Sequence, residues 1–237
     1  MLKNIRKYYS PNFDNSKRTK NKIKFIIIHY TGMKSENDAI KRLTEIQSEV
    51  STHYFIKYNG QILQLVPDLY VAWHAGKSMW GKNKLLNKSS IGIEISNPGH
   101  MFGYPKFKTK QIKSLVNLLK KLKIKYKINP KNILGHSDIA PDRKKDPGEY
   151  FPWEMLYKKK LSIWHKLEKK NVLKMRNILC DKKGIDKFLK NLIKIGYPKC
   201  KRLQLIKAFQ MRFRPELVNG KIDKECLEIS KSIKKYS

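Results

Sequence analysis

Acidic residues are scarce in this chain of 237 residues, which has 19 aspartates and glutamates against 53 lysines and arginines, for a net charge of +34. The imbalance runs through the whole chain, because residues 166–237 carry 21 basic and 7 acidic side chains and the remainder carries 32 and 12. Such a charge attracts polyanions. No helix-turn-helix, zinc-finger or ribonucleoprotein signature accompanies it, however, so we expect no nucleic-acid partner. A general preference for lysine in the source genome also accounts for the charge.

Cysteine and long apolar runs are scarce too. The three cysteines, Cys180, Cys200 and Cys226, include no CxxC pair, which argues against a disulfide framework and a thiolate zinc site. No apolar run approaches the roughly 18–20 residues that span a bilayer, so we expect no transmembrane segment. Residues 1–16 lack the apolar core of a secretory signal. The compartment stays open: with no visible leader the protein would be cytoplasmic, and it would be periplasmic if it is exported or if a leader was removed. The oligomeric state stays open too.

Four segments have the pattern of β-strands. Residues 25–28 are continuously apolar, which is typical of a strand buried on both faces. Residues 53–58 and 61–66 flank Asn59-Gly60, a hairpin signal in which both central residues are expected to adopt positive φ. In residues 90–96 the isoleucines alternate with other residues, so we expect Glu94 to point away from the core. A short strand is expected at 133–135.

Helical periodicity marks the other segments. A helix is expected from a Ser35 cap to about Val50, and a second over residues 109–128. The charged segment 158–173 is expected to form a helical connector. Three short amphipathic helices then follow, around residues 185–193 and 203–213 and after a cap at Asp223. We therefore predict an α/β fold with a mixed central sheet flanked by helices over residues 1–165, followed by a small three-helix domain over residues 166–237.

Three side chains suited to a metal lie at or after strand ends. His29 and His136 each end a predicted strand, and Asp146 lies in the loop that follows His136. Two imidazoles and a carboxylate fill three positions of a tetrahedral zinc and leave the fourth open for water. Spacing alone does not show that the two histidines meet, and Asp138 and Asp142 are alternative carboxylates near His136.

Five motifs in order resemble a known family. They are Ile26-Ile27-Ile28-His29-Tyr30-Thr31, Ser51-Thr52-His53-Tyr54-Phe55-Ile56, Ala72-Trp73-His74-Ala75-Gly76, Ile91-Gly92-Ile93-Glu94, and residues 135–148. Together they resemble the zinc-dependent N-acetylmuramoyl-L-alanine amidases of the amidase-2 type, over roughly residues 20–160. The resemblance implies hydrolysis of the amide between N-acetylmuramic acid, including its 1,6-anhydro form, and the L-alanine of the stem peptide. Peptidoglycan or its muropeptide fragments would be the partner, in bacterial cell-wall degradation or recycling.

The resemblance also implies roles for single residues. His29, His136 and Asp146 match the family's ligands of Zn²⁺, Glu94 its catalytic acid and base, and Lys144 its oxyanion-stabilising lysine. Three residues are candidates for contact with substrate. Trp73, which could stack on a sugar ring, and His74 could line the substrate groove, and Arg143 could pair with stem-peptide carboxylates or stay a solvated charge. Away from the substrate, His53 is expected to support the core and Asp138 to order its loop by accepting hydrogen bonds.

The second predicted domain carries a weaker resemblance. Residues 208–215 and 219–223 resemble the peptidoglycan-binding domain that follows the catalytic domain in related enzymes, although Arg214-Pro215 stand where many such domains have Gly-Leu. The main rival to an enzyme is a non-catalytic peptidoglycan-binding module. Related recognition proteins typically lose the third ligand, so its presence here favours an enzyme. A nucleic-acid-binding protein is supported by charge alone.

Overall fold

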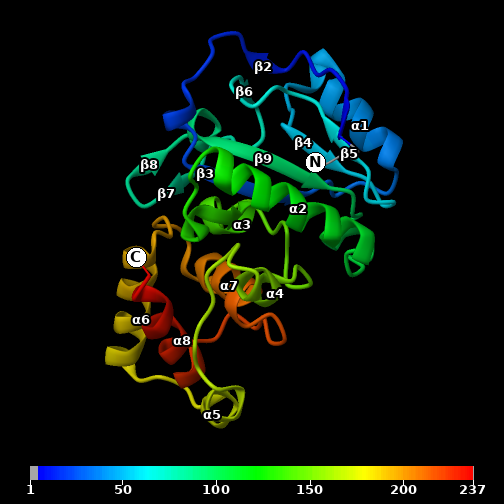
Figure 1. Ribbon diagram of the computed structural model, residues 1–237. Coiled ribbons are helices and arrows are strands. Elements are labelled where there is room, and N and C mark those ends of the chain that lie inside the picture. Colours follow the sequence, from blue (N-terminus) through cyan, green and yellow to red (C-terminus); the bar gives the residue numbers. More distant parts are fainter. Residues whose placement is uncertain (1–4, 237) are drawn as a thin grey trace.

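The centre of the fold is a mixed sheet of six strands in the computed structural model, which describes residues 5–236. Only the pair β4–β5 is antiparallel. Figure 1 shows the sheet in the upper half of the molecule, with α-helices around it. The strand order is β1 (Ile5–Lys7), β5 (Ile62–Gln64), β4 (Tyr54–Ile56), β9 (Ser90–Ile95), β3 (Phe25–Tyr30) and β10 (Ile133–Gly135). The predicted mixed sheet is confirmed.

The central strands β3, β9 and β10 position the site. Ile26, Ile27 and Ile28 of β3 are fully buried, which confirms a strand covered on both faces. The three strands are parallel, and their register places His29 beside Glu94. Parallel strands bring their carboxyl ends to one edge of a sheet, where ligands are usually bound.

Helices α1 (Glu36–Thr44) and α2 (Thr109–Lys125) cover opposite faces of the sheet. Phe55 packs in a cluster with Ala39 and Leu43 of α1, whereas the neighbouring strand residues Tyr54 and Ile56 pack with the leucines of α2. Because successive strand side chains point to opposite faces, the two helices must lie on different sides. Ser35 caps α1 as predicted, its hydroxyl accepting from the Asp38 N–H at 3.2 Å.

Three expectations about local structure are wrong. Helix α1 ends at Thr44 and not near Val50, because the chain makes a 3-10 turn and then a left-handed residue at Glu49 (φ 50°). Only Gly60 of the hairpin turn has positive φ, so Asn59 does not adopt the expected conformation. The predicted helix over 158–173 is interrupted, because residues 161–164 bury their side chains in the core.

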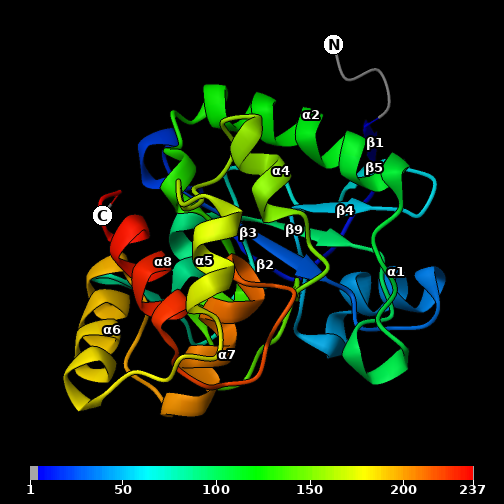
Figure 2. The ribbon, with the colours of Figure 1, turned by 90° about the horizontal axis from the view of Figure 1, so that it is seen from below.

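The lower half of Figure 1 is helical. The three predicted helices are α6 (Lys182–Ile195), α7 (Arg202–Phe213) and α8 (Lys224–Lys234), preceded by α4 (Trp153–Lys158) and α5 (Lys169–Met175). Figure 2 shows α5, α6, α7 and α8 grouped beside the sheet. One continuous hydrophobic cluster contains residues of the sheet, α2 and the helices α6 to α8. A domain boundary at residue 165 stays a prediction.

Short elements complete the chain. The antiparallel pairs β2 (Phe13–Asp14) with β6 (Val71–Ala72) and β7 (Met79–Trp80) with β8 (Asn83–Lys84) lie outside the main sheet. Helix α3 is a single turn, His136–Ile139. The 3-10 turns are Lys20–Lys22, Ile46–Ser48, Leu86–Ser89, His100–Phe102 and Pro130–Asn132. Among the described residues, no helix combines the length and hydrophobicity needed to cross a bilayer.

Candidate active site

A cavity of about 500 Å³ opens at the carboxyl edge of the central strands. Its walls come from the ends of β3 and β9, the start of α3, and the loops around residues 73–74 and 143–146. All eight predicted site residues line it: His29, Trp73, His74, Glu94, His136, Arg143, Lys144 and Asp146. Residues separated by more than 100 positions in the sequence therefore meet here.

His29, His136 and Asp146 bring three ligand atoms together at the floor of the cavity. The two Nδ1 atoms are 2.9 Å apart, and Oδ2 of Asp146 lies 3.0 Å from the His29 Nδ1 and 3.1 Å from the His136 Nδ1. All three residues are buried. The Ser137 N–H donates to the Asp146 carbonyl at 2.8 Å, which ties the Asp146 loop to α3.

The environment fixes the charge state of two of these groups. Burial, reinforced by the neighbouring His136, lowers the pKa of His29 to about 4, although Asp146 works in the opposite direction. Burial alone would raise the pKa of Asp146, but the charges and hydrogen bonds of His136 and His29 outweigh it and hold that pKa well below its usual range. A neutral His29 imidazole and an ionised Asp146 therefore coexist at neutral pH.

Glu94 reaches the same cavity from β9. Burial, together with the charge of Asp146, raises the pKa of Glu94 to about 8, and the Lys144 ammonium partly opposes this. The Glu94 Oε2 is buried and has no hydrogen-bond partner among residues 5–236. Lys144 lies on the cavity wall two residues before Asp146, and its backbone N–H is held by the Ala140 carbonyl at 3.0 Å.

The three residues predicted to contact substrate have protein partners. The Trp73 indole N–H donates to Asp14 at 2.8 Å, leaving the ring on the cavity wall. Both ring nitrogens of His74 face other side chains, His29 at 3.0 Å and Ser90 at 3.2 Å. The Arg143 guanidinium donates to the backbone carbonyls of Ala75 and Lys77. Substrate contact by these three residues stays a prediction.

The other histidine and aspartates considered from the sequence lie outside the cluster of ligand atoms. The fully buried His53 accepts from the Gly92 N–H at 3.0 Å, as expected of a residue that supports the core. Asp138 points away from the cavity and accepts from the Gly135 N–H at 2.8 Å and the Tyr197 hydroxyl at 2.7 Å. Asp142 is exposed. Of the three candidate carboxylates, only Asp146 approaches both histidines.

Sequence reasoning missed an aromatic wall beside the ligands. The Tyr30 hydroxyl lies 2.8 Å from the His100 Nδ1, and the His100 Nε2 lies 3.0 Å from Glu149. The His100 ring stacks on Tyr104. The sequence signals nearest to this wall are Gly99 and Gly148, since a Cβ at either position would lie 2.5 Å from the ring atoms or hydroxyl of a tyrosine.

Comparison with known proteins identifies a family over the part of the chain that contains these residues. The family described as N-acetylmuramoyl-L-alanine amidase, Amidase_2, matches residues 19–149. The chain is 36% identical to the N-acetylmuramoyl-L-alanine amidase AmiD of Escherichia coli over 231 residues, covering 90% of this chain and 82% of AmiD. It is 34% identical to the 1,6-anhydro-N-acetylmuramyl-L-alanine amidase AmpD of Haemophilus influenzae, covering 65% of this chain and 91% of AmpD.

Solved structures agree over nearly the whole chain. E. coli AmiD in complex with anhydro-N-acetylmuramic acid-L-Ala-D-γ-Glu-L-Lys superposes with a TM-score of 0.80 at 33% identity, covering 94% of this chain and 93% of that one. AmpDh3 of Pseudomonas aeruginosa in complex with an anhydromuramic pentapeptide gives a TM-score of 0.78 at 31% identity, covering 94% and 96%. The similarity therefore includes the helical part.

Proposed function

Because the chain belongs to the amidase-2 family and is an N-acetylmuramoyl-L-alanine amidase, we propose that His29, His136 and Asp146 hold a zinc ion at its active site. The observation that carries the proposal is the convergence of three buried ligand atoms from distant segments within 4.8 Å. The enzyme hydrolyses the amide between the muramic acid and the L-alanine of muropeptides.

The three residues fit zinc. A zinc ion with bonds of about 2.0–2.1 Å separates tetrahedral ligands by about 3.3 Å. The observed separations of 2.9, 3.0 and 3.1 Å need only a small expansion to reach that value. Zinc binds neutral imidazole and ionised carboxylate, which are the states that the pKa shifts of His29 and Asp146 favour. Three protein ligands also leave a fourth position open, as in catalytic zinc sites.

The proton transfers fall to Glu94. The chemistry that zinc supplies when bound at such a site is polarisation of a carbonyl and acidification of water. Glu94 carries an unpaired carboxyl oxygen at the cavity, and its pKa is raised to about 8, so both its ionised and its protonated forms are available near neutral pH. It would accept the proton of the attacking water and deliver it to the amine nitrogen of L-alanine as the amide bond breaks.

Lys144 would stabilise the negative charge that develops on the scissile carbonyl oxygen. Its ammonium acts on both Glu94 and His29, lowering the pKa of each, so its field reaches the reacting region. Loss of one electrostatic partner of this kind typically costs about 10²–10³ in rate.

We also propose anhydromuramyl peptides as substrates, because AmiD and AmpDh3 were solved in complex with such molecules. Trp73 presents its ring to the cavity with its N–H already satisfied by Asp14, which suits stacking against the sugar. Mass spectrometry of anhydro and reducing-end muropeptides, incubated with and without a zinc chelator, tests this. Release of the free stem peptide that the chelator abolishes is expected.

Two variants distinguish the residue proposed to transfer protons from a residue proposed to bind zinc. Glu94→Gln should keep its zinc and lose about 10²–10⁴ in kcat, because the amide side chain cannot cycle a proton. Asp146→Ala should lower the zinc content of the purified protein, because one of three ligands is gone. Zinc content by mass spectrometry and kcat on the same preparations are the measurements. Near-normal turnover by Glu94→Gln, or unchanged zinc in Asp146→Ala, would contradict the assigned role.

A further inference from the structure

The segment His74–Ala75, between β6 and β7, contacts both histidine ligands on the side away from their ligand atoms. The His29 Nε2 lies 3.0 Å from the His74 Nδ1, and the His136 Nε2 lies 3.2 Å from the Ala75 carbonyl oxygen. Adjacent residues of one loop therefore supply the outer partners of two ligands that are 107 positions apart in the sequence.

The contact with Ala75 assigns the proton on His136. A carbonyl oxygen only accepts hydrogen bonds, so this contact places the hydrogen on the His136 Nε2; the Arg143 guanidinium, which would require the opposite, lies farther from that nitrogen, at 3.5 Å, and donates to the Ala75 carbonyl instead. A neutral imidazole has only one N–H, which leaves a lone pair on the His136 Nδ1, directed at the ligand cluster. This is the tautomer that a metal bound through Nδ1 requires.

The hydrogen bond between Ser90 and Leu86 determines the direction of those made by His74. The Ser90 hydroxyl must donate to the Leu86 carbonyl, 2.6 Å away, so toward His74 its oxygen can only accept. The His74 Nε2–H therefore donates to Ser90 at 3.2 Å. The His74 Nδ1 is left to accept from the His29 Nε2–H, and this places the His29 lone pair on Nδ1 as well. In the series from His29 through His74 and Ser90 to the Leu86 carbonyl, each donor thus faces one acceptor.

The segment is itself fixed in place. The Asn87 Oδ1 accepts from the backbone N–H groups of His74 at 3.1 Å and Ala75 at 2.6 Å. The Arg143 guanidinium also donates to the Ala75 carbonyl. Gly92 of β9 makes room for the imidazole, because a Cβ there would lie 2.5 Å from the His74 Cγ. The glycine of the Ile-Gly-Ile-Glu motif is thus explained by the histidine of the Trp-His-Ala-Gly motif.

We propose that the segment His74–Ala75 sets the tautomer and orientation of both histidine ligands, and that His74 is a positioning residue for the metal and not a substrate ligand. The inference rests on the proposed zinc site. Both ring nitrogens of His74 are already used by His29 and Ser90, so neither is left to bind a muropeptide. Outer partners of this kind typically contribute 10–100-fold to metal affinity.

The test compares zinc affinity, by chelator competition, in four variants of the full chain. His74→Leu keeps the bulk and removes the acceptor, and should bind zinc about 10–100-fold more weakly. His74→Asn places an amide oxygen near the position of Nδ1 and should lose less than His74→Leu. Ser90→Ala breaks the chain of hydrogen bonds outside the cavity and should also weaken zinc binding. Trp73→Phe, a neighbouring change on the cavity wall, should leave zinc affinity unchanged.

A second readout is independent of activity. Nitrogen-15 NMR of the zinc-loaded wild type should show the hydrogen on Nε2 of His29, His74 and His136. Equal zinc affinity in the wild type and His74→Leu, with only KM raised, would overturn the inference and make His74 a substrate ligand. A hydrogen on the Nδ1 of His74 would overturn it too. A wild type that binds no zinc would instead overturn the metal assignment on which the inference rests.

Discussion

A single buried carboxylate, Asp68, joins three parts of the sequence. It accepts hydrogen bonds from the Tyr54 hydroxyl at 2.6 Å, the Tyr126 hydroxyl at 2.5 Å and the Lys125 ammonium at 2.7 Å. Burial alone would raise the pKa of Asp68, but these three partners outweigh it and lower the pKa below 3.8. The charge of Asp68 therefore stabilises the contact between the sheet and the end of α2.

Asp68→Asn should lower the free energy of unfolding by about 2–3 kcal/mol at pH 7, because hydrogen bonds to a buried charge are lost or reversed. Because the folded-state pKa is lowered, this contribution is fully present above the unfolded-state pKa near 4 and disappears as the pH falls through the folded value. Urea unfolding of both proteins at pH 7 and in acid is the measurement. A difference between them that stays constant into acid would contradict this account.

Single residues were predictable where a motif carries them. His29, Glu94, His136 and Asp146 could be named from the sequence, and the structure brings them into one cavity. The partners of His74 could not be named, because Ser90 and Asn87 occupy positions with no chemical signature of their own. Their roles come from the close approach of the loop at 73–76 to β9, and periodicity does not report contacts between distant segments.

At the scale of elements, α7 reaches across to the turn that begins with His136. Arg212 of α7 forms a buried ion pair with Asp138 of α3 and donates to the Ile133 carbonyl at 3.1 Å. Its guanidinium also lies 4.2 Å from the ring of Trp153. The helical part of the chain thus holds the backbone that carries a proposed metal ligand.

Arg212→Met should lower the free energy of unfolding by about 3–5 kcal/mol, because it leaves Asp138 buried without its cation. Adding Asp138→Asn should restore part of the loss, and the two changes should differ from additivity by about 0.5–3 kcal/mol. Chemical denaturation of the wild type, both single variants and the double variant measures this coupling. Strict additivity would show that the ion pair does not link the two elements.

Elements with strong local patterns were predicted well, and those fixed by distant packing were not. The alternation over residues 90–96 and the stripes of α2, α6 and α7 correspond to observed elements. β1 was missed because its three residues form a strand only through parallel pairing with β5. Residues 161–164 were expected to be helical because they lie within a lysine-rich segment. Leu161, Ile163 and Trp164 are instead buried in the core, and the helix is interrupted there.

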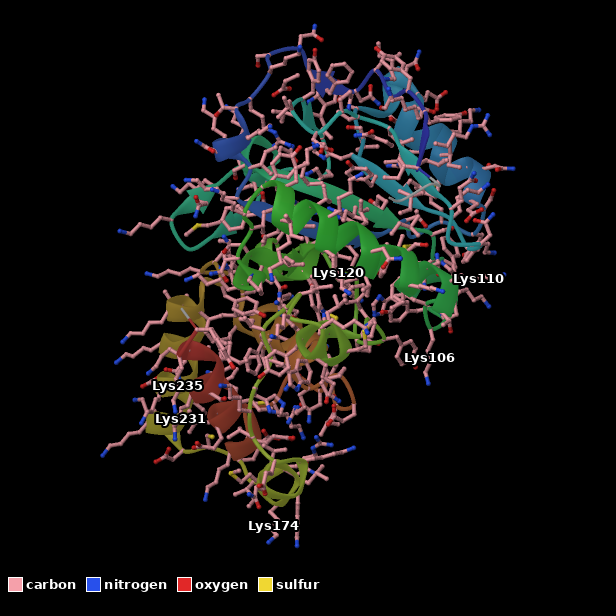
Figure 3. The ribbon with its side chains drawn as sticks, viewed as in Figure 1. Lys106, Lys110, Lys120, Lys174, Lys231 and Lys235 are labelled. Carbon is pink, nitrogen blue, oxygen red and sulfur yellow. The ribbon has the colours of Figure 1, made fainter. Side chains whose placement is uncertain are left out.

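At the scale of the whole molecule, the excess of positive charge extends over both residues 1–165 and residues 166–237. Figure 3 shows labelled lysines extending outward near α2 and from the region of α5 and α8. At physiological ionic strength the Debye length is about 8 Å, so charges on distant elements are largely screened from one another. The net charge of +34 therefore attracts anions mainly when they come close to the surface. The shared hydrophobic core holds residues 1–165 and 166–237 together.

That shared core makes residues 1–165 a poor independent unit in this chain. Trp80 packs against Tyr197 with ring centroids 5.0 Å apart, and Trp164 packs against Phe213 at 5.8 Å. Trp153 lies beneath Arg212. AmpD of H. influenzae, by contrast, is matched over 91% of its length by only 65% of this chain. An amidase of this family can therefore be shorter. In this chain, however, three tryptophans of residues 1–165 pack against side chains of residues 166–237.

We expect a fragment of residues 1–165 to be largely unfolded or aggregated. Burying a large apolar side chain contributes about 1.5–3 kcal/mol, so uncovering three tryptophans costs an amount comparable to the 5–15 kcal/mol that stabilises a typical domain. Size-exclusion chromatography, tryptophan fluorescence and zinc content of the fragment are the measurements, with the full chain as reference. Co-expression with residues 166–237 should restore a soluble, zinc-binding complex, because the interface is regained without the covalent link. A monomeric fragment with full zinc content and wild-type turnover would show instead that the amidase part folds alone.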